Sequence, residues 1–201
     1  MNDSSKMDVN ADGKTRLVQG AIDCVAENGI AGSSVRRIAE YAGVTPGLVR
    51  HHFGNKNKLL AECYRSLNTL ALSRMSKSMM SENRSLADDL MRTLKAFFPE
   101  DLRDVHQMRV LVAFWGAVLT TAEFAEVQAE TNLGFHRHLT DMMRFHLGDR
   151  KDLPVLADAV QAVIDGLWLE CCMNPSRMSP EGAIKRAHQF CLLALNQPGQ
   201  N

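Results

Sequence analysis

Long apolar runs are what the 201-residue sequence most clearly lacks. No stretch of about 18 apolar residues could span a bilayer, and no positively charged start is followed by an apolar run of signal-peptide length. Apolar residues still make up 45% of the chain, which is enough for a packed core. We therefore expect a cytoplasmic protein with no membrane partner.

The residue patterns of enzymes and metal centres are also missing. The five cysteines form no Cys-x-x-Cys pair and no metal-ligand spacing, so we expect reduced, buried thiols. His136 and His138 lie two residues apart, which points them to different sides of a helix, so they cannot chelate a metal together. The glycines form no phosphate-binding loop, and no nucleophile and base are arranged for catalysis. We expect no cofactor, no metal and no enzymatic activity.

Alternating β-branched segments are absent as well, and apolar residues instead recur at helical spacing along most of the chain. The segment VLVAFWGAVL at residues 110–119 is apolar on all sides, so it is expected inside a helical core. The pattern predicts an all-α fold of about nine helices.

The densest local signals lie within residues 33–60. A short helix is predicted between Ser34, whose hydroxyl can cap it, and Gly43, which can adopt the positive φ that ends a helix. Thr45 is expected to cap a second short helix, with Pro46 in its first position. Two short helices joined by a tight glycine-containing turn form a helix-turn-helix, whose second helix lies in the DNA major groove.

An excess of positive charge is absent from the chain as a whole, in which 23 Lys and Arg balance 23 Asp and Glu. The distribution is uneven, however. Residues 14–65 carry eight Lys and Arg against four Asp and Glu, a net charge of +4, whereas residues 66–201 carry fourteen against sixteen, a net charge of −2. A positive field confined to the helix-turn-helix region is expected when only that region meets phosphate.

Side chains and backbone groups suited to DNA surround the predicted helix-turn-helix. Basic donors fix the register of a protein on the phosphates, glycine lets the backbone approach closely, and a helix start is electropositive. The predicted DNA-binding residues are Lys14, Ser34, Arg36, Arg37, Thr45, Pro46, Gly47, Leu48, Arg50, His51, His52 and Lys56.

Residues 38–60, IAEYAGVTPGLVRHHFGNKNKLL, resemble the DNA-binding signature of the TetR family. The shared pattern is I-A-x-x-A-G-V-[ST]-x-G, then an aromatic cluster ending in Phe, then K-x-x-L. This chain has His51 where the family usually has Tyr, which would make a phosphate contact sensitive to pH near a usual pKa of about 6.5. The resemblance implies a homodimeric repressor of a palindromic operator that a small-molecule effector releases.

Three segments are predicted on this basis. They are a disordered N-terminal arm over residues 1–13, a three-helix helix-turn-helix DNA-binding domain over residues 14–60, and a larger helical effector-binding and dimerisation domain over residues 61–201. The helices predicted at residues 153–173 and from residue 179 onward have more apolar face than one neighbour can cover. We expect these last two helices to form a two-fold homodimer interface, with recognition helices about 34 Å apart.

Three short stretches resemble the BetI branch of the family, whose members respond to choline: AFWG at 113–116, EVQAETN at 126–132 and IDGLWL at 164–169. The resemblance implies an effector such as choline or another quaternary ammonium compound, which aromatic faces and a carboxylate hold by cation–π attraction and charge. The predicted effector-binding residues are Phe98, Phe114, Trp115, Glu123, Phe135, Asp165 and Trp168.

Three alternatives stay open from the sequence. The aromatic residues recur at helical spacing, so they could equally be core packing. The protein could instead repress an efflux or catabolic operon in response to a hydrophobic ligand. It could also be an adaptor that binds DNA without any effector.

Overall fold

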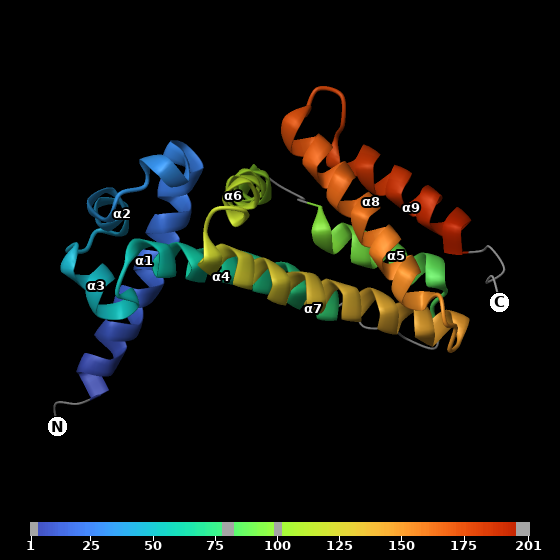
Figure 1. Ribbon diagram of the computed structural model, residues 1–201, viewed down its shortest axis with the longest axis horizontal. Helices are drawn as coiled ribbons and strands as arrows, with labels where there is room; N and C mark the ends of the chain where they lie inside the picture. Colours follow the sequence, from blue (N-terminus) through green and yellow to red (C-terminus); the bar gives the residue numbers. More distant parts are fainter. Residues whose placement is uncertain (1–3, 78–82, 99–101, 196–201) are drawn as a thin grey trace. The chain divides into compact units, whose positions relative to one another are not determined.

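The computed structural model describes residues 4–77, 83–98 and 102–195 (Figure 1). Nine helices and no strand occur in these ranges, which confirms the predicted all-α fold. The helices in chain order are α1 (Ser4–Gly32), α2 (Val35–Ala42), α3 (Gly47–Phe53), α4 (Lys56–Lys77), α5 (Leu86–Phe97), α6 (Leu102–Val118), α7 (Ala122–Leu147), α8 (Leu153–Met173) and α9 (Pro180–Leu195).

The helices form two compact units. The first contains the chain up to Leu67 together with His106–Gln128, and the second contains Asn68–Val105 and the chain from Ala129 on. The first unit therefore joins the α1–α3 region to α6 and the start of α7, whereas the sequence predicted a division after residue 60. The predicted assignment of functions to residues 14–60 and 61–201 stays a prediction.

Helix α1 begins earlier than the sequence predicted. Its backbone is helical from Ser4, whereas the sequence predicted a disordered arm over residues 1–13, and residues 1–3 lie outside the described part of the chain. No proline precedes Lys14, so no residue there removes a backbone donor from the helix. Gly29, with φ of +66°, interrupts the helical geometry near its end.

Aromatic packing holds the core of the first unit together. The rings of Tyr64 and Phe114 are fully buried and stack with their centroids 4.8 Å apart, and Phe124 meets Phe114 edge-on at 5.1 Å. The Tyr64 hydroxyl also donates a hydrogen bond to Gln128. These contacts fix α6 and the start of α7 against α4 within this unit.

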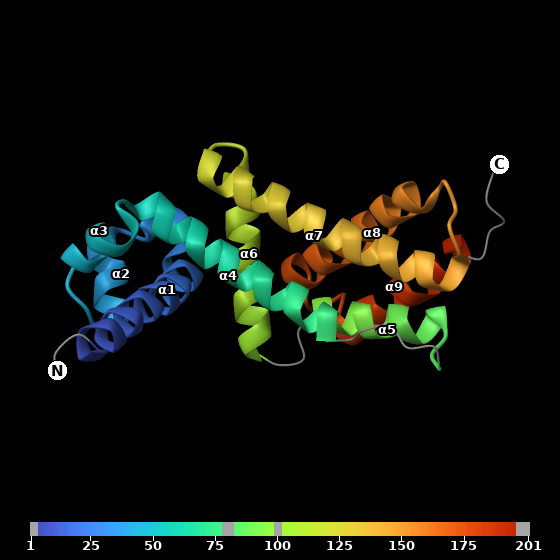
Figure 2. The same ribbon diagram turned by 90° about the horizontal axis from the view of Figure 1, so that it is seen from below.

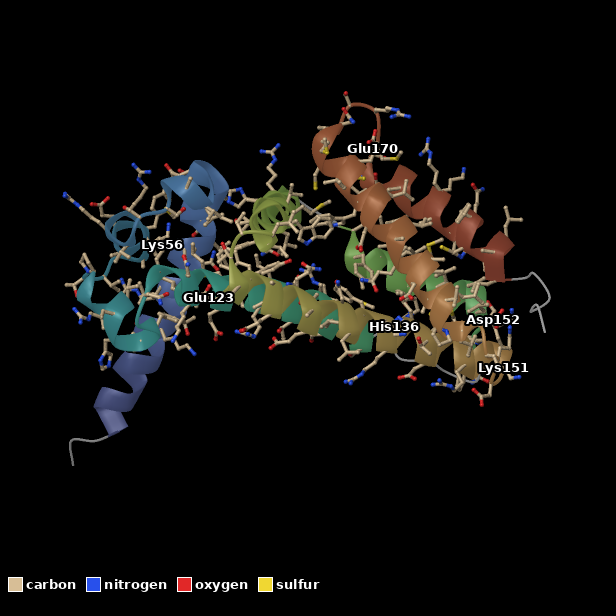
Figure 3. The ribbon with its side chains drawn as sticks, viewed as in Figure 1. Lys56, Glu123, His136, Lys151, Asp152 and Glu170 are labelled. Atoms are coloured by element: carbon tan, nitrogen blue, oxygen red, sulfur yellow. The ribbon has the colours of Figure 1, made fainter. Side chains whose placement is uncertain are left out.

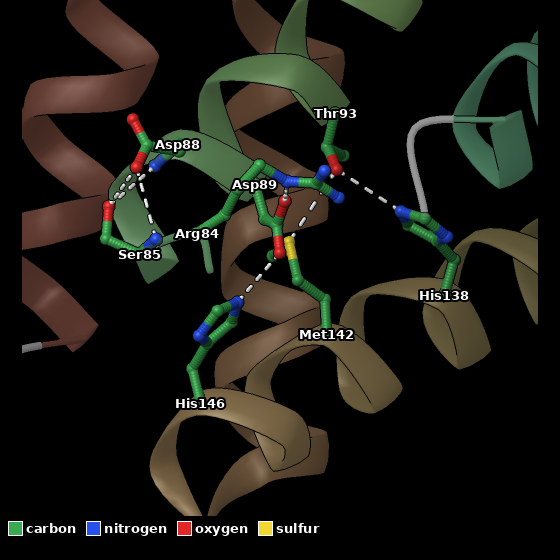
Figure 4. A network of polar contacts seen from close by, with 8 residues as sticks. All are labelled: Arg84, Ser85, Asp88, Asp89, Thr93, His138, Met142 and His146. Carbon is green, nitrogen blue, oxygen red and sulfur yellow. Dashed lines mark hydrogen bonds and ion pairs between the residues drawn. The ribbon is translucent and has the colours of Figure 1, made fainter. Parts of the chain in front are cut away.

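Helices α5, α8 and α9 pack together in the second unit, and α8 and α9 lie side by side (Figures 1 and 2). A buried polar network joins α5 to α7 in the same unit (Figure 4). Asp89, only 2% exposed, accepts a hydrogen bond from Arg84 Nε at 2.6 Å and lies 2.9 Å from His146 Nε2. Thr93 Oγ1 lies 3.2 Å from His138 Nε2. Each of these polar groups thus has a partner, as burial requires.

Within the described ranges, no single helix is both long and apolar enough to cross a membrane. Residues 106–118 and α7 are long and apolar enough only when they are taken together, and the chain bends between them. Phe114 and Phe124 of this pair are buried in the core described above.

Candidate nucleic-acid interface

The turn between α2 and α3 has the local geometry that the sequence predicted. Ser34 Oγ accepts a hydrogen bond from the Arg37 backbone N–H at 3.2 Å and so caps α2. Gly43 ends the helix with φ of +61°, a conformation that side chains other than glycine rarely adopt. Arg16 on α1 donates a hydrogen bond from Nη2 to the Gly43 carbonyl at 2.8 Å. Arg16 thus positions the turn, a role that local patterns could not reveal because the two residues lie far apart in sequence.

Helix α3 is anchored by one residue and presents the others. Val49 is 1% exposed and packs into the core of the first unit. Arg50 and His51 are exposed, and space is open around the position that a Gly47 Cβ would occupy. The helix begins at Gly47 with Pro46 at its N-cap. The sequence predicted Thr45 as the cap and Pro46 in the first position, one residue before Gly47, and Pro46 does have helical backbone angles, with φ of −56° and ψ of −27°.

The other predicted residues near the start of α3 are likewise either exposed or packed against the core. Thr45 and Pro46 are exposed at the start of α3, and Leu48 is partly buried against the core. Because one side of α3 packs on the core, its exposed side can enter a DNA groove while that packing stays intact.

Two predicted phosphate donors on α2 already have partners. Arg36 Nε pairs with Glu40 at 3.1 Å on the surface, and Arg37 Nη1 donates a hydrogen bond to the Gly32 carbonyl at 2.6 Å. The Arg36 pair is highly exposed, so it contributes little to stability and is easily exchanged for a phosphate. Arg37 instead ties α2 to the end of α1.

Lys14 within α1 and Lys56 at the start of α4 lie near the end of α3. Lys14 Nζ pairs with Glu62 at 3.3 Å and lies 5.8 Å from the centre of the Phe53 ring. Lys56 is the first residue of α4 (Figure 3) and is partly buried. Asn55 precedes it and accepts a hydrogen bond from the Lys58 backbone N–H at 2.9 Å, which caps α4. Asn55 was not among the residues predicted from the sequence, although an Asn three residues before a backbone donor is a usual signal of a helix cap.

The two adjacent histidines differ in orientation. His51 is exposed, whereas His52 is partly buried, and its Nε2 lies 3.6 Å from the position of a Gly13 Cβ on α1. Burial, with the nearby His51 and Lys14, lowers the pKa of His52 below its ordinary value. Among the described residues, its buried Nε2 has no hydrogen-bond partner. His52 thus packs against α1, and His51 is better placed for the predicted phosphate contact.

The seven predicted effector-binding residues divide between the two units. Phe114 belongs to the buried aromatic core of the first unit, and Trp115 packs partly buried against that core. Glu123 (Figure 3) lines a cleft of about 360 Å³ in the same unit, and Lys14 and Glu62 line this cleft too. These three residues are therefore placed near the DNA-binding helices.

The other four predicted residues belong to the second unit. Phe98, Phe135 and Trp168 are buried, 2%, 8% and 6% exposed respectively, and the Phe135 ring lies 4.6 Å from that of Phe97. Asp165 lines a groove of about 430 Å³ between α7 and α8. Three of the seven predicted residues thus belong to the first unit and four to the second, and their assignment to one effector site stays a prediction.

Comparison with known families decides the identity of both parts. Residues 17–63 match the bacterial regulatory proteins of the tetR family, and residues 86–195 match the C-terminal domain of BetI-type transcriptional repressors. The chain belongs to the TetR family. Its C-terminal domain is BetI-type, and this match confirms the resemblance found in the sequence.

Curated relatives agree with this assignment. The transcriptional regulator BetI of Pseudomonas paraeruginosa is 26% identical over 182 residues, which cover 88% of this chain and 90% of the relative. BetI of Ectopseudomonas mendocina is 25% identical over 189 residues, covering 92% and 94%. These relatives are named as transcriptional regulators and not as enzymes. The TetR-family chain is a DNA-binding transcriptional regulator.

Solved structures share the fold. A transcriptional regulator from Rhodococcus sp. superposes with a TM-score of 0.80 at 26% identity and covers 92% of this chain and 99% of its own. A transcriptional regulator from Saccharomonospora viridis, solved in complex with choline, gives a TM-score of 0.78 at 17% identity, covering 90% and 95%. The second likeness establishes the fold alone.

Proposed function

We propose that this regulator is a homodimeric repressor that binds a palindromic operator and is released by a small-molecule effector, with choline or another quaternary ammonium compound as the first candidate. The observation that carries the proposal is the geometry of α3. Val49 anchors this helix, while Gly47, Arg50 and His51 are exposed for a groove and its phosphates.

The exposed faces of the last two helices support the homodimer. Val155 and Met173 on α8 are 69% and 66% exposed, and Phe190 and Leu193 on α9 are 56% and 70% exposed. The exposed positions of α8 between Val155 and Met173 include the small residues Ala159 and Gly166, and a Cβ at Gly166 would meet open space. A second copy of the chain could approach closely there and bury these apolar side chains, which two-fold symmetry would pair with their equivalents.

Two observations support a cationic effector in the second unit. The BetI-type match covers this unit's α5, α8 and α9, and a protein of the same fold has been solved with choline. Phe98, Phe135 and Trp168 supply aromatic rings there, and such rings attract quaternary ammonium groups. An effector shifts the equilibrium only by its different affinities for the DNA-bound and free conformations.

Two other regulators remain as alternatives. A hydrophobic effector would use the same buried aromatic side chains without a carboxylate. An adaptor that binds DNA without an effector would keep the α2–α3 geometry and show no ligand response.

Fluorescence anisotropy with DNA from the region upstream of the gene tests the proposal. The full-length protein should bind this DNA as a dimer and prefer it to random duplex of equal length. Choline or betaine aldehyde should weaken binding by at least about tenfold, which corresponds to a coupling free energy of about 1.4 kcal/mol. Tight operator binding that no quaternary ammonium compound weakens would reject the cationic effector and leave the two alternatives.

A further inference from the structure

The groove between α7 and α8 has the features of a second binding site, apart from the buried aromatic residues. Its volume is about 430 Å³, within the usual range of about 300–1,000 Å³ for small-molecule sites. Asp165 and Asp158 line it from α8, and Leu133 and His136 line it from α7. The groove therefore combines two carboxylates with an apolar wall inside one unit.

Asp165 is a partly buried carboxylate, and no ion pair joins it to a cationic side chain within the described ranges. Burial raises its pKa to about 6, against the smaller opposing effect of a hydrogen bond from Gln161. Asp89 of the same unit shows the contrast (Figure 4). Burial acts to raise the pKa of Asp89 too, but Arg84 and His146 hold it below its ordinary value. The fold thus provides counterions for one buried carboxylate and leaves the other facing a groove.

A second carboxylate lies on the same side of α8. Asp158 precedes Asp165 by seven residues, which is two helical turns and about 10 Å along the axis. His136 Nδ1 lies 2.8 Å from Asp158 Oδ1, and the Asp158 side chain remains 73% exposed. A ligand can therefore approach Asp158 from solvent while it occupies the deeper position at Asp165.

The lining of the groove favours a cation that donates hydrogen bonds. Leu133, 49% exposed, offers an apolar surface for an alkyl chain, and the side-chain oxygens of Asp158, Asp165 and Gln161 accept N–H donors. A quaternary ammonium has no N–H, and its usual recognition by aromatic faces has no Phe, Tyr or Trp ring to use in this lining.

We propose that the α7–α8 groove binds a linear alkyl diamine, with one primary ammonium at Asp165, the other near Asp158 and the alkyl chain against Leu133. Each ammonium then forms a charge-assisted hydrogen bond with a carboxylate, and the ligand serves as a counterion for Asp165. The site is distinct from the aromatic residues proposed for choline and does not depend on DNA binding.

Isothermal titration calorimetry with the full-length protein and hexamethylenediamine tests the proposal. We expect saturable binding, and Asp165→Asn and Asp158→Asn should each weaken it by at least about tenfold. Asp141, an exposed carboxylate on α7 that pairs with Arg144, supplies the control. Asp141→Asn should change the affinity by less than about twofold. Circular dichroism checks that each variant is folded. Because Asp158 is exposed, its variant keeps the test valid should Asp165→Asn fail to fold.

Ligand controls separate the chemical classes. Hexylamine, with one ammonium, should bind at least about tenfold more weakly than hexamethylenediamine, and tetramethylammonium should not compete for the site. The proposal is overturned by an absence of saturable binding, by equal affinity in the wild type and both groove variants, or by displacement of the diamine by tetramethylammonium. Failure of operator binding in the earlier anisotropy experiment would leave these outcomes unchanged.

Discussion

Replacing Asp165 by Asn should stabilise the folded protein at neutral pH. Burial raises the pKa of this carboxyl from 3.8 to about 6, against the weaker effect of the Gln161 hydrogen bond. A carboxyl whose pKa is higher in the folded state binds its proton more tightly there, so the folded state loses stability as pH rises and the group ionises. Asparagine has nearly the same size and never carries that charge.

The structure sets the size of the effect. A pKa difference of about two units corresponds to roughly 3 kcal/mol at about 1.4 kcal/mol per unit. Asp165 lines an open groove, where water screens its charge, so we expect a gain of about 1–2 kcal/mol in the free energy of unfolding. The gain should be absent below about pH 4, grow between about pH 4 and 6, and stay constant above.

Urea unfolding of the wild type and the Asp165→Asn variant across this pH range measures the difference directly. The Asp141→Asn variant is the matched control, because Asp141 is an exposed carboxylate that pairs with Arg144. Its unfolding free energy should lie within about 0.5 kcal/mol of the wild type at every pH. An Asp165→Asn gain of equal size at about pH 4 and pH 8, or no gain at pH 8, would refute the reasoning.

The remaining predictions concern the interface, the core and the effector. Gly20→Ala should cost about 1–3 kcal/mol of stability in urea unfolding and impair operator binding, since its Cβ would lie 2.6 Å from the Ala42 backbone N; Gly116→Ala, in open space, should do neither. Lys56→Ala should weaken binding to all DNA sequences and reduce the salt slope of operator binding by about one unit; an unchanged slope removes this lysine from the phosphate contacts. Trp168→Ala should blunt release by choline in the anisotropy assay while effector-free operator binding survives. Dissociation of the dimer, seen by light scattering, would instead assign the tryptophan to the core or interface.

The features of the site that the sequence predicted correctly are determined by residues close to one another in the chain. Ser34 caps α2 and Gly43 ends it because both signals act within one helical turn. Pro46 has the helical backbone angles expected of the first position of α3, because its ring fixes φ locally.

The packing partners of helices could not be predicted in this way. Helical spacing placed Phe114 in a core, but it could not show that this core is the one that supports α3, because Tyr64 contacts it from far away in the sequence. The pairing of Asp89 with His146, 57 residues apart, likewise depends on how α5 and α7 meet. Phe114 and Asp165, which the sequence predicted for one effector site, accordingly belong to different units, and helical spacing alone could not show this.

Hydroxyl-radical footprinting of the full-length protein on its upstream DNA tests the central claim most directly. We predict two protected segments of an inverted repeat, centred about 34 Å apart along the duplex, because a dimer places two copies of α3 in successive major grooves. Arg50→Ala should abolish this protection at protein concentrations where the wild type saturates it. Uniform or absent protection by the wild type, with no preference over random duplex, would contradict the account.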